Sequence, residues 1–165
     1  MRYVRSLRSL LCMPAAVVTL AFMAQPAFAG FEEGLKALQG GDMAVAEKEL
    51  QPLAKERDPR AQFLLGFYIY GSAESKLFDV NKAAPLLLDA AERGYLPAML
   101  PLAGAYAEGN GVPKSASEAY KWVAIAERWN VPNANFALEQ AARDLSPDEA
   151  TKAKAAALAY TFKSK

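Results

Sequence analysis

The feature that most limits how this chain can fold is a repetition in its middle. The stretch Ala61 to Gly71, AQFLLGFYIYG, resembles Ala98 to Gly109, AMLPLAGAYAEG, and Asp79 to Gly94 resembles Ser115 to Asn130. The first pair is offset by 37 residues and the second by 36, which predicts a connector one residue longer in the first copy. Periods of this length are typical of helical hairpins that stack on one another.

Apolar spacing predicts two short helices in each copy. In the second copy, Ala98, Leu102 and Tyr106 recur every four residues, as on one face of a helix. A similar apolar face centres on Trp122 in the following helix. Tyr106 and Trp122 could stack on a ligand, but their places in the repeat favour a role in filling the space between hairpins.

Capping residues recur with the same period. Asp79 and Ser115 stand where each second helix should begin, and Ser115 with Glu118 predicts a capping box. Gly94 and Asn130 stand where these helices should end, and both residue types tolerate the left-handed conformation of a helix C-terminus.

The glycine-containing stretch Gly109 to Pro113, GNGVP, is interpreted as the turn between two antiparallel helices. Its two glycines allow the backbone to reverse, and Val112 provides an apolar side chain beneath the turn. The stretch lacks the G-x-G-x-x-G and G-K-[ST] patterns of phosphate-binding loops. The sequence therefore gives no support for a nucleotide site.

The second copy resembles a Sel1-like repeat, a relative of the tetratricopeptide repeat. The resemblance is carried by A-x-x-x-L-A-x-x-Y-x-x-G-x-G-V followed by E-A-x-x-W-x-x-x-A, between Ala98 and Ala126. The first copy departs from this pattern: Ile69 takes the tyrosine position, GSAESKLF replaces G-x-G-V, and Leu86 replaces the tryptophan. The resemblance implies an all-α fold, a short right-handed α-solenoid of antiparallel helical hairpins.

The flanking segments fit as partial units of the same solenoid. Residues 30–57 resemble a tetratricopeptide hairpin, and Asp58-Pro59 predicts the start of the next helix. After the two copies, at 58–94 and 95–130, residues 131–165 predict a partial repeat and a cap helix that starts with a capping box from Ser146 to Glu149. Residues 30–165 are thus expected to form one domain.

Residues 1–29 are predicted to be a secretory signal peptide. Arg2, Arg5 and Arg8 form a basic start, an apolar run follows, and Ala27 and Ala29 are the small residues that signal peptidase recognises. The run is shorter than the roughly 20 residues of a membrane span, so an uncleaved anchor is the less favoured alternative. We expect a periplasmic or secreted protein from a Gram-negative bacterium, with no membrane insertion after cleavage and no lipid on Cys12.

The expected mature chain, Gly30 to Lys165, contains no histidine and no cysteine. Thiol nucleophiles, histidine bases and most metal sites are therefore excluded, and we expect no cofactor and no metal. Without the three arginines of the leader, the chain has 16 Lys and Arg and 18 Asp and Glu, a net charge of −2. Such a charge does not favour nucleic acid as a partner. These features favour a non-enzymatic adaptor over the alternative, a cell-envelope hydrolase that uses paired carboxylates.

The resemblance implies that the first helix of each unit lines the concave face, where another protein or a peptide would bind. Large apolar and charged side chains on this face are the candidate partner-binding residues: Arg60, Phe63, Phe67, Tyr70, Leu100, Glu108, Phe136, Gln140 and Arg143. Aromatic and arginine anchors of this kind dominate many protein interfaces. Alternatively, the same side chains cover the inner core of a short solenoid. No catalytic residue is assigned.

The first prediction concerns processing. Protein isolated from a periplasmic extract should have the intact mass of Gly30 to Lys165, because Ala27 and Ala29 direct cleavage before Gly30. A mass that still includes residues 1–29 would contradict cleavage and favour the anchored alternative.

Overall fold

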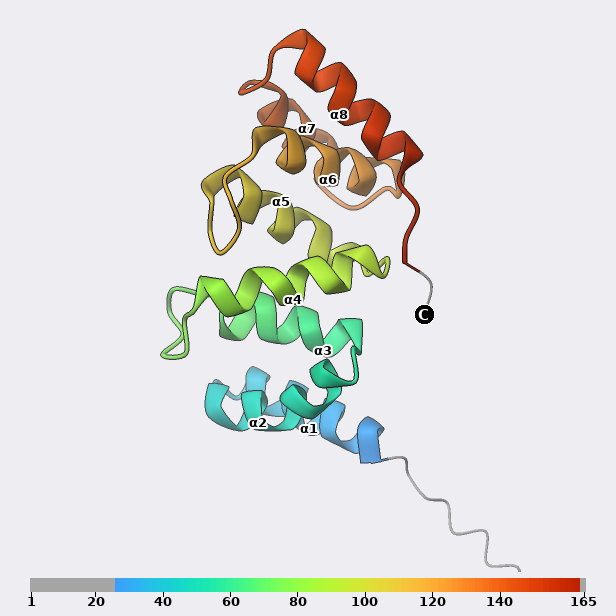
Figure 1. Ribbon diagram of the computed structural model, residues 1–165. Helices are drawn as coiled ribbons and strands as arrows, with labels where there is room; N and C mark the ends of the chain where they lie inside the picture. Colours follow the sequence, from blue (N-terminus) through green and yellow to red (C-terminus); the bar gives the residue numbers. More distant parts are fainter. Residues whose placement is uncertain (1–25, 164–165) are drawn as a thin grey trace, which may run out of the picture.

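The computed structural model describes residues 26–163, and within this range the chain contains helices and no strand (Figure 1). The predicted leader lies almost wholly outside this range. The elements in chain order are α1 (Pro26–Gln39), α2 (Met43–Lys55), α3 (Pro59–Phe63), the π-helix η1 (Leu64–Ile69), α4 (Val80–Glu92), the 3₁₀-helix η2 (Leu96–Ala98), α5 (Met99–Glu108), α6 (Ala116–Arg128), α7 (Ala134–Ala142) and α8 (Pro147–Ala159).

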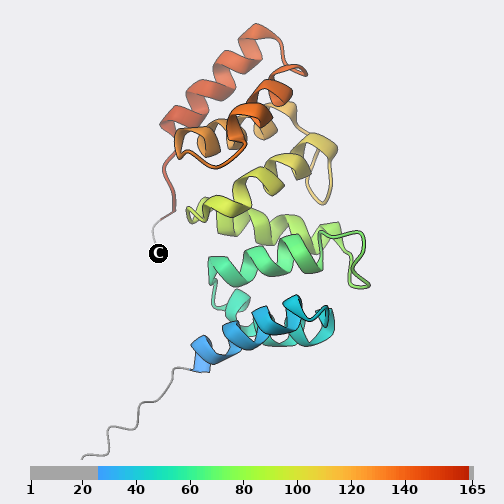
Figure 2. The same cartoon turned by 180° about the vertical axis from the view of Figure 1, so that it is seen from behind.

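Successive helices pair and stack into an elongated array. Helix α1 packs on α2, α3 and η1 pack on α4, and α5 packs on α6. Helix α2 also contacts α3, α4 contacts α5, and α6 contacts both α7 and α8, so each unit rests on the next. The even-numbered helices α2, α4 and α6 lie nearer the viewer in Figure 1, and α1, α3, α5 and α7 lie nearer in Figure 2.

Small side chains let the helices approach closely. Ala46, Ala61, Ala90 and Ala98 are among the alanines with no exposed surface. Larger residues fill the remaining space in two clusters, around Leu50, Leu65 and Ile69 in the first half and around Leu102, Trp122 and Ile125 in the second. Trp122 is 2% exposed, which confirms that it is a core residue between hairpins.

The helix ends lie where capping predicted them, but the capping box predicted for Ser115 and Glu118 does not form. Asp79 and Ser115 are N-cap residues whose side chains accept hydrogen bonds from the amides of Asn81 and Glu118. Gly94 and Asn130 have φ of 81° and 55°, as expected for helix C-termini. The box at Ser146 is reciprocal, whereas the Glu118 carboxylate accepts a hydrogen bond from Lys121 instead of returning to Ser115.

The extra residue of the first copy lies in its first helix, not in its connector. The amide of Tyr70 donates to the carbonyl oxygen of Leu65, five residues earlier, in the π-helix η1. After this wide turn, the Asp79 amide donates to the Tyr70 carbonyl just as the Ser115 amide donates to Tyr106, both at 2.8 Å. The two connectors therefore have equal length, and Tyr70, not Ile69, occupies the tyrosine position.

The glycine turn packs directly on the preceding unit. Gly111 has φ of 72°, and a Cβ atom added there would lie 1.9 Å from the carbonyl oxygen of Val80. The turn after α5 thus contacts the first residue of α4 backbone to backbone. A glycine is required for both the conformation and the contact.

A partly buried polar contact ties the turn after α2 to α4. The Asp89 carboxylate on α4 accepts hydrogen bonds from the side chains of Arg57, Gln62 and Arg93, with Gln62 Nε2 at 2.6 Å from Oδ2. The guanidinium of Arg57 and the amide of Gln62 stabilise the ionised carboxylate, and the pKa of Asp89 is lowered to about 2.

The segment after α8 returns along the stack toward α4. Arg128 on α6 donates to the carbonyl oxygens of Ala157, Leu158 and Tyr160 at 2.9–3.1 Å, which caps the C-terminus of α8. The Tyr160 ring contacts the Trp122 ring with centroids 5.2 Å apart, and burial raises the pKa of Tyr160 to about 12. The amide of Lys163 donates to the Glu92 carbonyl at 2.8 Å. These contacts join three units.

Replacing Gly111 by alanine should destabilise the fold far more than the same change at Gly41. Both glycines have positive φ, but a Cβ atom at Gly41 would meet nothing within 4 Å. Gly41→Ala should cost about 1 kcal/mol for the left-handed conformation alone. Gly111→Ala should cost about 1–3 kcal/mol more, because Val80 must move. Urea unfolding of both variants measures this difference, and equal losses would contradict the backbone contact.

Acid should weaken the contact at Asp89. Because the folded-state pKa is about 2, below the value of the unfolded chain, the ionised carboxylate stabilises the fold above about pH 4, and this stabilisation is lost as the pH falls toward 2. Asp89→Asn should lower the free energy of unfolding at pH 7 by about 1–2 kcal/mol and flatten its decline in acid. Asp144→Asn is the control, since Asp144 forms no ion pair within residues 26–163. An unchanged acid profile in Asp89→Asn would contradict this account.

Candidate functional site

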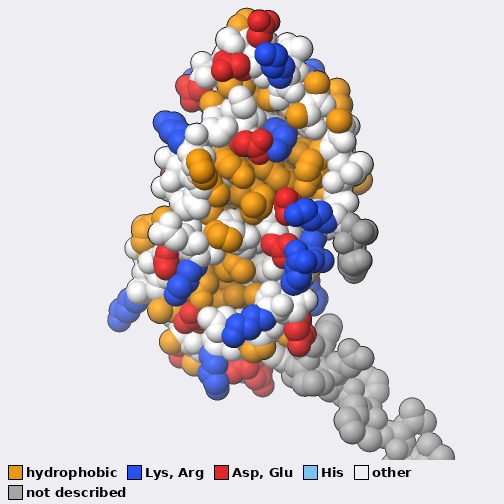
Figure 3. All heavy atoms as spheres, in the orientation of Figure 1, with side chains coloured by type: hydrophobic (Ala, Val, Ile, Leu, Met, Phe, Trp, Pro, Cys, Tyr) orange, Lys and Arg blue, Asp and Glu red, His pale blue; other side chains and the backbone are white. Residues whose placement is uncertain are grey.

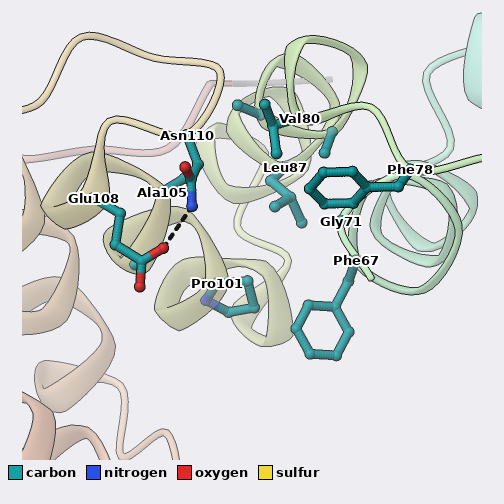
Figure 4. Close-up of a pocket in the computed structure, with 13 residues that line it drawn as sticks. Phe67, Gly71, Phe78, Val80, Leu87, Pro101, Ala105, Glu108 and Asn110 are labelled. Atoms are coloured by element: carbon teal, nitrogen blue, oxygen red, sulfur yellow. Dashed lines mark hydrogen bonds between the residues drawn. The ribbon is translucent and has the colours of Figure 1, made fainter. Parts of the chain in front are cut away.

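Two hollows lie on the side of the stack that is built by the first helices of the units, namely α1, α3 with η1, α5 and α7. The first has a volume of about 200 Å³ and lies among η1, α4, α5 and the turns beside them. Figure 4 shows Phe67, Phe78 and Leu87 on one side of this hollow and Pro101 and Glu108 on another. Its walls are mainly apolar, with Glu108 and Asn110 hydrogen-bonded to each other at one edge.

The second hollow lies among α5, α6 and α7. Its volume is about 390 Å³, and apolar residues such as Leu100, Val123 and Phe136 provide most of its walls. Gln140 and Asp144 are its polar lining residues. Three predicted partner-binding residues, Leu100, Phe136 and Gln140, therefore meet at one place, although they come from two helices.

Exposed aromatic side chains surround these hollows. Phe67 is 41% exposed, Phe78 49% and Phe136 62%. Phe63 is half-buried and stacks on Phe67, with ring centroids 5.5 Å apart and an interplanar angle of 8°. Aromatic side chains left exposed at a hollow are typical of binding sites.

Three of the predicted residues lie elsewhere. Tyr70 is only 3% exposed, and its hydroxyl donates to Glu47, so the expectation that it lies open on the binding face is wrong. Its position follows from the π-turn in η1, which moves it into the core. Arg60 is exposed, pairs with Asp58 at 2.6 Å and lies 4.5 Å above the Phe31 ring. Arg143 is exposed but lines neither hollow.

Sequence reasoning missed three residues of this region: Phe78, Gly104 and Asp144. Phe78 lies in the GSAESKLF connector, where the first repeat departs from the pattern. Gly104 lies in the middle of α5 and lines both hollows. A glycine inside a helix costs about 1 kcal/mol relative to alanine, and this one has no positive φ to require it. A glycine inside a predicted helix, kept despite this cost, could therefore have been recognised in the sequence as a residue with a role in binding.

A third hollow opens on the opposite side of the stack, between α2 and α4. Its volume is about 340 Å³, and its lining includes Tyr70, Pro85 and Leu86 together with Lys55 and Lys82. Figure 3 shows hydrophobic side chains gathered over the middle of this side. The two sides thus differ in charge: carboxylates line the first two hollows, and lysines line the third.

The part of the chain from 26 to 163 offers little for acid–base catalysis. Each of the first two hollows is lined by a single carboxylate, whereas glycosidases require a pair about 5–10 Å apart. Asp58, Glu74, Asp89 and Glu149 are the carboxyl groups in this range with a resolved change in pKa, and in each the pKa is lowered, mainly by side-chain hydrogen bonds. A general acid needs a raised pKa.

Between residues 26 and 163, no group of three His, Cys, Asp or Glu residues is placed to hold a metal ion. None of the helices described there has the length and apolar character needed to cross a bilayer.

The fold is similar to that of a known repeat protein. Among the solved structures that resemble this chain is the crystal structure of a protective antigen present in uropathogenic Escherichia coli strains, which displays an SLR (Sel1-like repeat) fold. The TM-score is 0.71 at 21% sequence identity, and the match covers 79% of this chain and 29% of the other. The likeness confirms the predicted all-α solenoid with the Sel1-like repeat fold. No protein-family model matches the sequence, and no curated protein matches it either.

Proposed function

We propose that this chain, a helical repeat with the Sel1-like fold, is a non-enzymatic adaptor that binds a segment of another protein through the side built by its first helices. The observation that carries the proposal is the pair of apolar hollows that meet at Gly104, with Phe67 and Phe136 exposed beside them. Helical repeat proteins commonly use such extended surfaces to bind partners.

The predicted leader supports a site of action in the bacterial periplasm. Export would place the adaptor among envelope proteins, and the absence of cysteine and histidine after residue 29 is compatible with an interaction role. The envelope hydrolase is the weaker candidate, because neither hollow on this side is lined by two carboxylates.

Exchange of the exposed aromatics should separate binding from stability. Phe67→Ser and Phe136→Ser should each lower partner capture from an envelope extract about tenfold or more, as expected for aromatic anchors, while the melting temperature changes by only a few degrees. Trp122→Ala should instead lower the free energy of unfolding by about 3–5 kcal/mol, because a buried side chain is lost. Tyr70→Ser should also melt early, since Tyr70 is buried.

The control is Leu158→Ser on α8, because Leu158 is 63% exposed, close to the 62% of Phe136, and lines none of the three hollows. Capture and thermal melting are measured for every variant. Equal capture by wild type, Phe67→Ser and Phe136→Ser would refute the assignment of this side as the binding surface.

A further inference from the structure

Gly104 divides the exposed surface of α5 between the two hollows. At about 100° per residue, Pro101, Ala105 and Glu108 project to one flank of α5 and line the first hollow, while Leu100 and Ala103 project to the other and line the second. Gly104 is exposed, lies between the flanks, and lines both hollows.

The absence of a side chain at Gly104 is not explained by packing. A Cβ atom added there would have no atom within 4 Å other than its own helix backbone and chain neighbours, so alanine would fit without strain. Glycine at such a position leaves room for another backbone to approach the helix closely. The exposed aromatics on both sides supply apolar walls for the side chains of that segment.

The charge of the two hollows is uniformly negative. Glu108 and Asp144 line them, and no lysine or arginine does. Neither carboxylate forms an ion pair within the described part of the chain. Glu108 is the last residue of α5, and Asp144 lies just beyond the end of α7. Helix C-termini add negative potential at both places.

We infer that the segment bound here is an extended, cationic peptide of another protein, whose backbone crosses α5 at Gly104. Two apolar side chains enter the two hollows, and a lysine or arginine beside them pairs with Glu108 or Asp144. A helix with its side chains is about 10 Å across, and alternate residues of an extended chain point to the same side. The two apolar residues are therefore two or four positions apart. This inference rests on the proposed function and specifies the chemistry of its ligand.

The test is selection of random 12-residue peptides displayed on phage against the purified protein. The enriched sequences should contain two apolar residues two or four positions apart with an adjacent lysine or arginine. For a synthetic peptide of the enriched sequence, fluorescence anisotropy should show binding weakened at least about tenfold by Gly104→Trp, because the side chain blocks the crossing. The combined change Glu108→Lys with Asp144→Lys should weaken binding at least about tenfold and reverse its dependence on salt, because added salt then screens a repulsion instead of an attraction.

Matched variants distinguish blocking from misfolding. Gly104→Ala should fold with an equal or higher melting temperature, and Gly104→Leu provides a smaller obstruction should Gly104→Trp melt early. Glu127→Lys combined with Glu139→Lys makes the same total charge change at two exposed residues outside both hollows and should leave affinity nearly unchanged.

The outcomes separate this inference from the proposed function. Enrichment of acidic sequences would point to the third hollow with Lys55 and Lys82, and it would overturn both the inference and the assigned binding side while leaving an adaptor role as such intact. Equal binding of the peptide by wild type and by folded Gly104→Trp or Gly104→Leu would overturn the crossing at Gly104 but not the adaptor role. No enrichment of any peptide would count against the proposed function itself.

Discussion

The close approach of neighbouring helices is the constraint on which the rest of the structure depends. Alanines without exposed surface lie between the helices, and Gly111 brings the turn after α5 into contact with the backbone of Val80. Such contacts hold each unit at a fixed position on the next. Three small residues of α5 that line the second hollow, Ala103, Gly104 and Ala107, leave the space for it. The packing of the stack and the shape of its candidate binding surface thus have a common origin.

The sequence predicted the features that depend on local chemistry. Helix starts at Asp79, Ser115 and Ser146 and the helix end at Gly94 follow from capping and backbone conformation, which a few neighbouring residues determine. The burial of Trp122 follows from its place in the repeat.

The remaining features depend on register and on contacts between units. One wide turn in η1 rotates all the residues after it, so Tyr70 lies in the core although regular helical spacing predicts an exposed position. Sequence spacing could not locate this turn, because an extra residue in the helix and one in the connector give the same offset. Asp144 lines the second hollow and its neighbour Arg143 does not, and both lie beyond the end of α7, where helical periodicity no longer predicts the direction of a side chain.

Binding of a peptide across α5 is the central claim to be tested. The most direct measurement is a two-dimensional amide NMR titration of the isotopically labelled protein with an enriched peptide. We expect the largest shift changes at Gly104 and at residues of the two hollows beside it, such as Ala103 and Ala105. Changes concentrated instead at Lys55, Lys82 and Leu86 would place the ligand on the opposite side of the stack and contradict the claim.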